Sequence, residues 1–554
     1  MSPNEYKEGL KTSCKKKMKR LTFLLTFLLN CVVNASAGDI FVSTDGNDRS
    51  EGTKEAPVKT VHQALRMARE WRRLNDIRQA NGINIILREG RYRMDEPLLV
   101  RPEDSGTEVS PTHIRSMEGE RAVLCGDPMQ QHEQLYPASG MERMLGFDQE
   151  NHTITVPLSV TKHLKEFLHQ TKGSKTFTPA IPLNMVVHQR WAIAILRIKD
   201  ITVSKKQAVV SFLEPESKLE FEHPWPQPII NGEKGSSSFL IRKTEQRDGI
   251  ERLVVIQGTD KQPIEHLHFE DLTFENTCWN RPLHKGHVTL QGGFPVIDAY
   301  KLAKEGLPWA ETLENQAWIE RPVAAVSVTN ARHVDFSGCT FRNLGSTALD
   351  YMTGVSDCSI VYNRFENIGG NAILAGSFAE SPREVHCPYT DLAPLCRRLL
   401  IHENTITNAS CEDWGAVGIG CGYVSNTSIT DNTVSHVNYS GICVGWGWTP
   451  KNTGMRENVI AGNKVTDFAR QLYDAGGIYT LSNQPNSVIE NNVIDSLGAA
   501  PYATNDRGFY IYLDAETDGY TIRNNWCPQQ KFGDNHPGPA IVWGENGPEI
   551  EKKQ

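Results

Sequence analysis

Carboxylates recur beside short glycine-led segments in the C-terminal half of this 554-residue chain. Asp413, Asp474 and Asp506 each stand two residues before a glycine, and Asp514 ends the later apolar run 509–513. Hydrolysis of a glycosidic bond takes two carboxyl groups, one as acid and one as base or nucleophile. Alignment of the Asp-x-Gly sequences predicts that these aspartates stack, although like charges about 5 Å apart repel and raise one another's pKa.

A structural role explains any single one of these aspartates equally simply. Asp caps turns through hydrogen bonds to the backbone, and for an isolated Asp-x-Gly that role is favoured. Aromatic residues that could stack on sugar rings are interleaved with the acids, and this favours a sugar site for the group as a whole. These residues are Trp414, Tyr439, Trp446, Trp448 and Tyr512.

The segments that must position these residues form a repeat. An Asn-x-apolar sequence recurs with steps of 41, 28, 31, 29 and 33 residues, at Asn363, Asn404, Asn432, Asn463, Asn492 and Asn525. Apolar triplets follow at 372–374, 417–419, 442–444, 478–480, 509–511 and 540–542. A period of 20–50 residues with glycine and asparagine corners is typical of stacked strands, because one coil cannot bury its inner face alone. The sequence therefore predicts an all-β fold, a right-handed parallel β-helix with a small antiparallel β insertion.

The N-terminus has the pattern of a signal peptide over residues 1–37. Basic residues between 15 and 20 precede the apolar run 21–33 and the small-residue sequence Ala35-Ser36-Ala37. That run is too short to span a bilayer. We therefore expect export, to the periplasm or beyond the cell, without a transmembrane segment. The net charge of −8 argues against a nucleic-acid or polyanion partner.

Three further regions follow. Residues 38–125 predict an N-terminal cap and the first β-helix strands, with a helix over 60–74. Residues 126–260 interrupt the repeat with alternating segments such as 153–156 and 208–212, which indicates an inserted β subdomain. The parallel β-helix catalytic domain is expected over 261–554, with an excursion near 280–322 that could build a site on one face.

Cysteine and histidine spacing predicts neither a metal nor a cofactor. The chain has no Cys-x-x-Cys, and His402, His436 and His536 lie far apart in the repeat. Cys387 and Cys396 could form a disulfide in an oxidising compartment.

Several phrases of the sequence resemble glycoside hydrolase family 141. Segments 40–48, 87–92 and 269–274 do so weakly. More telling are Tyr439-Ser440-Gly441-Ile442, Gly445-Trp446-Gly447-Trp448 and Asp474-Ala475-Gly476-Gly477-Ile478-Tyr479. The resemblance implies an exported bacterial β-helix enzyme that acts on plant glycans, in a family with α-L-fucosidase and xylanase activities. It also implies a catalytic pair of aspartates, which falls on Asp474 and Asp514.

Spacing alone would not select that pair. The aligned repeats place Asp506 level with Asp474, whereas Asp514 follows eight residues later, up to about 26 Å along an extended chain. The pair requires a bend between strand and site, and Asp506 stays open as the partner of Asp474. The expected substrate-binding residues are Asp413, Trp414, Tyr439, Trp446, Trp448, Asp506 and Tyr512.

The carboxylates and aromatic residues predict a glycoside hydrolase that acts on an oligosaccharide or polysaccharide. The resemblance implies a plant or pectic glycan and an α-L-fucosidase-type exo reaction. A xylanase, a polysaccharide lyase and a non-enzymatic glycan-binding solenoid are alternatives. A lyase must neutralise a uronate and needs a Lys or Arg base, whereas the expected face is richer in Asp and Trp. The sugar, the linkage, the stereochemical course and the oligomeric state stay open.

Overall fold

The computed structural model describes residues 37–128, 132–170, 172–223, 226, 228, 238–244, 248–298, 319–378, 394–501 and 507–552. Residues 1–36 of the expected signal peptide, Cys387 and Asp506 lie outside these ranges. Cys396 is a buried free thiol. No helix in the described ranges is long and apolar enough to cross a membrane.

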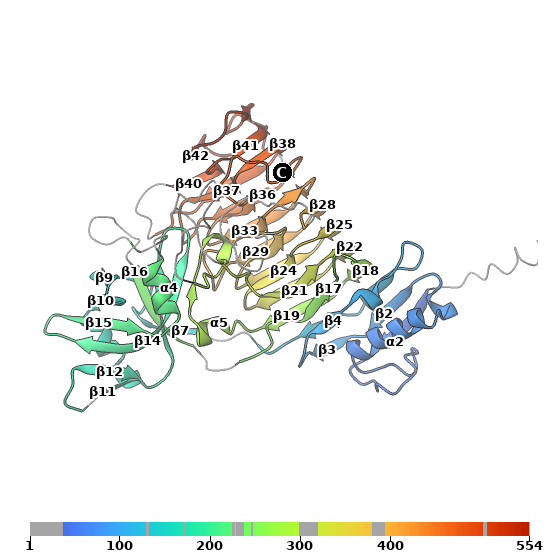
Figure 1. Cartoon of the computed structure of the whole chain (residues 1–554), viewed down its shortest axis with the longest axis horizontal. Helices are drawn as coiled ribbons and strands as arrows, with labels where there is room; N and C mark the ends of the chain where they lie inside the picture. Colours follow the sequence, from blue (N-terminus) through green and yellow to red (C-terminus); the bar gives the residue numbers. More distant parts are fainter. Residues whose placement is uncertain are drawn as a thin grey trace, which may run out of the picture.

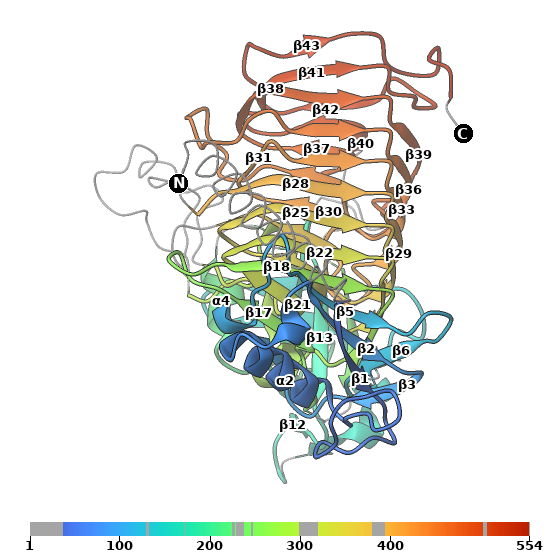
Figure 2. The ribbon, with the colours of Figure 1, turned by 90° about the vertical axis from the view of Figure 1, so that its right-hand side faces the viewer.

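The main body is a right-handed parallel β-helix, as predicted, whose coils stack one above another (Figures 1 and 2). Three parallel sheets, here named A, B and C, run along the stack. A typical coil gives one strand to each sheet in turn, as β22, β23 and β24 do.

Sheet A consists of β1 (Gly38–Val42), β2 (Ile83–Leu87), β5 (Thr112–Ser116), β18 (Ile264–Glu270), β22 (Ala331–Ser337), β25 (Val355–Val361), β28 (Cys396–His402), β31 (Val424–Ser425), β32 (Ser428–Thr430), β35 (Val459–Ala461), β38 (Asn483–Glu490), β41 (Asp518–Arg523) and β43 (Val542–Trp543). Sheet B consists of β3 (Gly90–Arg93), β6 (Ala122–Cys125), β19 (Thr273–Thr277), β23 (Thr340–Leu344), β26 (Arg364–Ile368), β29 (Thr405–Ala409), β33 (Thr433–Val437), β36 (Lys464–Phe468) and β39 (Val493–Leu497). Sheet C consists of β4 (Leu98–Val100), β17 (Val254–Gln257), β21 (Ala324–Thr329), β24 (Thr347–Tyr351), β27 (Ile373–Ala375), β30 (Ile419–Cys421), β34 (Ile442–Val444), β37 (Ala475–Thr480), β40 (Gly508–Leu513) and β42 (Phe532–Asp534).

Similar side chains stack on successive coils and fill the interior. Phe274, Phe341 and Phe365 occupy equivalent positions of sheet B, with ring centroids 4.9 and 4.7 Å apart. Such ladders explain why the repeat can be detected in the sequence, since equivalent inward positions have similar neighbours in successive coils.

The repeated asparagines form a buried ladder at the corner that enters sheet B. In each step the Oδ1 atom of one asparagine accepts from the backbone N–H and the Nδ2 group of the preceding one, at 2.8–3.1 Å for Asn363 through Asn546. Because every such corner would otherwise bury unpaired backbone groups, the asparagine is a structural requirement of the turn.

The apolar triplets belong to sheet C, with one exception. The triplets at 442–444, 478–480 and 509–511 lie within β34, β37 and β40. Placing 540–542 in the same column is wrong, because the sheet C strand that pairs with β40 is β42, and Val542 begins β43 in sheet A. The last coil is shorter than the repeat that precedes it, with 21 residues between Asn525 and Asn546.

Helix α2 (Val61–Arg73) lies beside β1 and β2 at the N-terminal end of the stack (Figure 2). The Thr60 hydroxyl caps it by accepting from the Gln63 N–H at 3.1 Å, and its apolar positions from Val61 to Trp71 are buried. The helix therefore covers apolar residues of the first strands.

An antiparallel subdomain interrupts the solenoid and packs beside it (Figure 1). Its strands are β7 (His132–Tyr136), β8 (Glu142–Arg143), β9 (Gly146–Asp148), β10 (Thr153–Pro157), β11 (Leu168–Gln170), β12 (Thr176–Pro179), β13 (Leu183–His188), β14 (Ile193–Val203), β15 (Gln207–Phe212) and β16 (Ser238–Thr244), joined by β20 (His287–Val288). The remaining helices are α3 (Ser159–His163), α4 (Glu216–Glu222), α5 (Arg281–His284), and the 3-10 turns η1 (Ile77–Gln79), η2 (Pro102–Asp104), η3 (Lys165–Phe167) and η4 (Gln291–Gly293). The expected segments 153–156 and 208–212 pair antiparallel within it.

The hairpin between β13 and β14 reaches the coils of the β-helix. The His188 Nε2 atom donates to the Gln471 carbonyl at 2.9 Å, and the Tyr473 N–H donates to the Arg190 carbonyl at 3.3 Å. This hairpin therefore lies directly beside residue 474.

Candidate functional site

Asp474 and Asp514 flank two adjacent strands of sheet C. Asp474 directly precedes β37 and Asp514 directly follows β40, while Ala475 pairs with Gly508 and Thr480 with Leu513. In straight strands this register would keep the two carboxylates far apart.

A bend in both strands removes that separation. Tyr510 and Ile511 are consecutive, yet both lie in the β-helix core. Ile478 also lies in the core, and a Cβ atom on the preceding Gly477 would meet Ile494 Cγ2 at 2.3 Å. Two successive inward residues break the alternation of a regular strand and turn the chain. Asp474 itself has a left-handed backbone, with φ of 61°.

A column of side chains on the outer face of sheet C connects the two aspartates. Tyr479 and Tyr512 occupy paired positions, with rings 5.2 Å apart at 79°. The Tyr512 hydroxyl donates to Asp474 Oδ1 at 3.0 Å, and the Tyr479 hydroxyl donates to Asp514 Oδ2. Asn535 Nδ2 donates to the other Asp514 oxygen at 2.8 Å. Both carboxylates are therefore held by neutral hydrogen-bond donors.

Gln291 joins the two halves of this network from the excursion. Its Nε2 group donates to the hydroxyls of Tyr439 and Tyr479 at 3.2 and 3.0 Å. The Tyr439 hydroxyl in turn donates to the Asp474 backbone carbonyl at 2.9 Å. Gln291 lies in η4, so the segment after the insertion completes the site.

The surroundings of Asp474 raise its pKa. Asp474 and Asp514 are 9% and 7% exposed. Burial raises the pKa of Asp474, the negative charge of Asp514 raises it further, and the Arg507 guanidinium, 3.5 Å away, partly opposes both effects. Burial also raises the pKa of the Tyr439, Tyr479 and Tyr512 hydroxyls, so all three stay protonated donors near neutral pH.

The predicted stack of Asp-x-Gly aspartates is wrong in its register. Ala475 pairs with Gly508, and the Asp474 N–H donates to the Arg507 carbonyl at 2.6 Å. Arg507 is therefore level with Asp474, one residue away from the alignment that chose Asp506. The reason is that the bend lies one residue closer to Gly476 in the first coil than to Gly508 in the second.

Asp413 also lies apart from the pair. Its Oδ2 atom accepts from His287 Nε2 at 2.8 Å, and both side chains are almost fully buried. Its Oδ1 atom accepts from the Gly415 N–H at 3.2 Å, which is the turn role that an isolated Asp-x-Gly predicts.

The predicted aromatic residues have different surroundings. Tyr439 and Tyr512 are part of the network above, and the partly buried Trp448 packs against Tyr479 and Tyr512. Trp446 is 3% exposed and packs against Phe294 and Phe378 in a second core. Trp414 is partly buried against the β-helix core.

Sequence reasoning missed Gln291, Asn535 and the role of Tyr479. The segment 474–479, which ends in Tyr479, is one of those that resemble the family. Because Ile478 points into the core, the alternation of a strand predicts that Tyr479 points outward, and this could have identified it as a site residue. Gln291 and Asn535 have no comparable signal, because their contacts come from segments far away in the chain.

A small apolar recess of about 30 Å³ adjoins Tyr439 and Tyr479. It lies where Gly420 and Cys443 continue the outer column of sheet C beyond Tyr479, and Phe294 and Trp446 form its other wall. The short side chains at these two positions leave the space open. Within the described ranges, no group of three or more His, Cys, Asp or Glu side chains could hold a metal ion.

Comparison with known proteins agrees with this architecture. A family model described as the GH141 insertion domain matches residues 127–247, and one for a right-handed beta helix region matches residues 397–542. A solved structure named "Glycoside hydrolase" is 33% identical, with a TM-score of 0.84 over 93% of this chain and 97% of its own.

Two curated proteins match over short segments only. The "Uncharacterized protein YwoF" of Bacillus subtilis is 36% identical over 92 residues, which is 16% of each chain. The "Pectate lyase PEL9" of Emericella nidulans is 31% identical over 93 residues, 17% of this chain and 20% of that protein. Both matches therefore span a fifth or less of the curated relatives.

The insertion-domain match and the similarity along nearly the whole chain confirm the predicted family and the predicted handedness of the coils. The chain belongs to glycoside hydrolase family 141.

Proposed function

We propose that this hydrolase removes a terminal α-L-fucosyl-type residue from a plant or pectic glycan, with Asp474 as general acid and Asp514 as nucleophile or base. The observation that carries the proposal is the buried carboxyl pair, in which each aspartate accepts from a tyrosine and the charge of Asp514 raises the pKa of Asp474. A pair of carboxyl groups in different environments is what glycoside hydrolysis uses.

In this mechanism the protonated Asp474 gives its proton to the departing glycosidic oxygen. Asp514 either attacks the anomeric carbon or takes a proton from the attacking water. Tyr479 and Asn535 orient the Asp514 carboxylate, and Gln291 fixes the tyrosine hydroxyls. As charge leaves Asp474 in the transition state, Arg507 stabilises the new carboxylate.

Two features support a terminal 6-deoxy sugar. The recess beside Tyr439 and Tyr479 is apolar and small enough for a single methyl group. The β13–β14 hairpin lies against Tyr473, next to Asp474, and the Asp474 and Asp514 residues are both less than 10% exposed. Such enclosure suits the end of a chain better than an open groove for xylan. The N-terminal pattern supports action outside the cytoplasm, which cell fractionation would test.

The proposal is tested with purified protein on aryl α-L-fucosides, aryl α-galactosides, xylan and pectic oligosaccharides. We expect release from the fucosides, and release from xylan alone would contradict the fucosidase assignment. Asp474→Asn and Asp514→Asn should each lower kcat by about 10²–10⁴-fold on a natural glycan. Asp260→Asn, in an exposed turn, is the matched control.

The leaving group separates the two roles. An aryl fucoside with an acidic phenol needs little protonation, so Asp474→Asn should retain more activity on it than on a natural glycan. Asp514→Asn should lose activity on both. Equal losses for Asp474→Asn on the two substrates would reject its role as the acid.

A further inference from the structure

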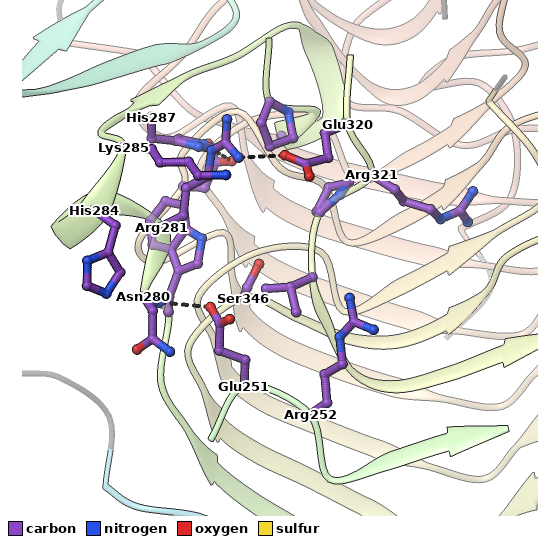
Figure 3. A pocket seen from close by; sticks show the side chains of 16 residues that line it. Glu251, Arg252, Asn280, Arg281, His284, Lys285, His287, Glu320, Arg321 and Ser346 are labelled. Carbon is purple, nitrogen blue, oxygen red and sulfur yellow. Dashed lines mark hydrogen bonds and ion pairs between the residues drawn. The ribbon is translucent and has the colours of Figure 1, made fainter. Parts of the chain in front are cut away.

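A second cavity lies beside the first coils of sheet C, separate from the aspartate pair. Its volume is about 270 Å³ (Figure 3). One wall consists of residues that precede β17, β21 and β24, and the other consists of the excursion that contains α5 and Gly293. The repeated geometry of the coils does not require such a space, because the hydrophobic core lies inside the sheets.

Two cations face this cavity, Arg252 and Lys285. Figure 3 shows Arg252 and Lys285 reaching into it from opposite walls. Both side chains are exposed, and neither has an ion pair or a side-chain hydrogen bond with any residue that the structure describes.

The acids of the cavity are already engaged. Glu320 accepts from Arg281 at 2.7 Å, and Asp413 accepts from His287. Glu251 accepts from the Asn280 N–H at 2.8 Å, and burial raises its pKa while the Arg252 charge lowers it. Arg281 and Arg321 are likewise paired, with Glu320 and Asp350, which leaves Arg252 and Lys285 as the lining cations without an ion pair among the described residues.

We propose that this cavity is a binding subsite for a carboxylate-bearing sugar unit, a uronic acid, of a glycan. The planar Arg252 guanidinium can hold a carboxylate through two parallel hydrogen bonds, and Lys285 adds a point charge from the opposite wall. The Ser346 hydroxyl, which points into the space in Figure 3, can bind a sugar hydroxyl, and Trp279 supplies an apolar surface.

The turn η4 contacts both this cavity and the tyrosines beside the aspartate pair. Gly293 lines the cavity, while Gln291, two residues earlier in the same turn, binds Tyr439 and Tyr479. The inference rests on the proposed function only in taking the ligand to be part of a glycan. The fucosyl-type residue and the uronate would then be different units of one substrate.

Direct binding tests this without requiring turnover. Isothermal titration calorimetry of the full chain with galacturonate and digalacturonate should show binding that galactose lacks and that weakens with added salt. Arg252→Gln and Lys285→Gln should each weaken Kd about tenfold, because each removes a charge-assisted hydrogen bond. The double variant Arg49→Gln/Lys206→Gln changes exposed cations elsewhere and should bind as the wild type does.

Other outcomes would overturn the subsite. These are unchanged binding in the Arg252→Gln/Lys285→Gln protein, equal binding of galactose, no binding by the wild type, or tighter binding of a galactose sulfate ester than of galacturonate. Formation of an unsaturated uronide that depends on Arg252 and Lys285 would instead make this a lyase site. The same titrations on Asp474→Asn separate the two proposals, since that variant should bind galacturonate normally even if the assigned catalytic role is wrong.

Discussion

Asp474 and Asp514 are equally buried but have different neighbours. Asp514 accepts from two neutral donors, Tyr479 and Asn535, whereas Asp474 has one tyrosine and the Arg507 guanidinium near it. Burial raises the pKa of Asp474, and the charge of Asp514 raises it further. When two carboxyl groups have different environments, their pKa values differ, so one can act as the acid and the other as the base or nucleophile.

The Arg507 charge gives a prediction about pH. Burial and Asp514 raise the pKa of Asp474, and Arg507 lowers it. Arg507→Gln should therefore raise that pKa further and move the basic limb of the kcat/KM profile to higher pH, since a general acid works only while protonated. The measurement is the pH profile on an aryl glycoside.

Arg523→Gln serves as the control, because Arg523 is similarly exposed and pairs with Glu490 on sheet A. Its profile should match the wild type. A basic limb that stays in place or moves to lower pH in Arg507→Gln would show that Asp474 is not the group that limits activity at high pH.

At the scale of elements, the repeat carries two kinds of information. The asparagines and, except in the last coil, the apolar triplets have the same surroundings from coil to coil, so their spacing predicts the corners and the strands of sheets B and C. The register that places Arg507 level with Asp474 has no such regularity. It depends on the bend at Gly477 and Tyr510, where two successive residues turn inward, and only packing against the core shows this.

The asparagine ladder should contribute measurably to stability. Asn432 is fully buried, and its side chain bonds to Asn404, Asn463 and the Ile401 carbonyl. Asn432→Ala leaves several of these groups unpaired, so we expect a loss of about 2–4 kcal/mol in the free energy of unfolding. Thermal and denaturant unfolding of the purified variant would measure it.

Asn84→Ala is the matched control. Asn84 lies on β2 and donates to Asp39 at 2.7 Å in an exposed position. The change there should cost no more than about 0.5 kcal/mol. Similar losses for both variants would mean that the ladder contributes no more than an exposed side-chain hydrogen bond.

At the scale of the whole molecule, the site depends on three segments that the sequence separates widely. The coils supply Asp474 and Asp514, the excursion supplies Gln291, and the insertion places its β13–β14 hairpin beside Tyr473. The fold class and the presence of an insertion could be predicted, because both follow from local periodicity. The docking of the insertion could not, since it rests on contacts between residues distant in the chain, such as the burial of Trp191 and Leu240 in the β-helix core and the ion pair of Arg242 with Glu412.

The ion pairs of Glu412 form a small charged cluster where the insertion meets the coils. Glu412 Oε2 lies 3.2 Å from Arg242 Nη1 and 3.2 Å from His132 Nε2. Burial raises the pKa of Glu412, but His132 and Arg242 more than offset this, and the net pKa lies below its ordinary value of 4.5. Two atoms of Arg242, Nε and Nη2, are buried without a hydrogen-bond partner among the described residues, so this guanidinium depends on Glu412 for compensation.

Glu412→Gln should therefore loosen the insertion without unfolding the coils. Removal of one member of a buried pair leaves the other uncompensated, at a cost of about 3 kcal/mol. Hydrogen exchange should show faster exchange in 132–244 and in the β13–β14 hairpin, with little change in sheets A and B. Glu403→Gln, at an exposed coil position, is the control and should match the wild type.

The pH dependence gives a second readout. Because the folded-state pKa of Glu412 is lowered, the stabilisation is present above about pH 4.5 and is lost as pH falls through the lowered value, so the wild type should lose it in acid and Glu412→Gln should not. Unchanged exchange in the hairpin of Glu412→Gln would show that the apolar contacts of the insertion alone hold it against the aspartate pair.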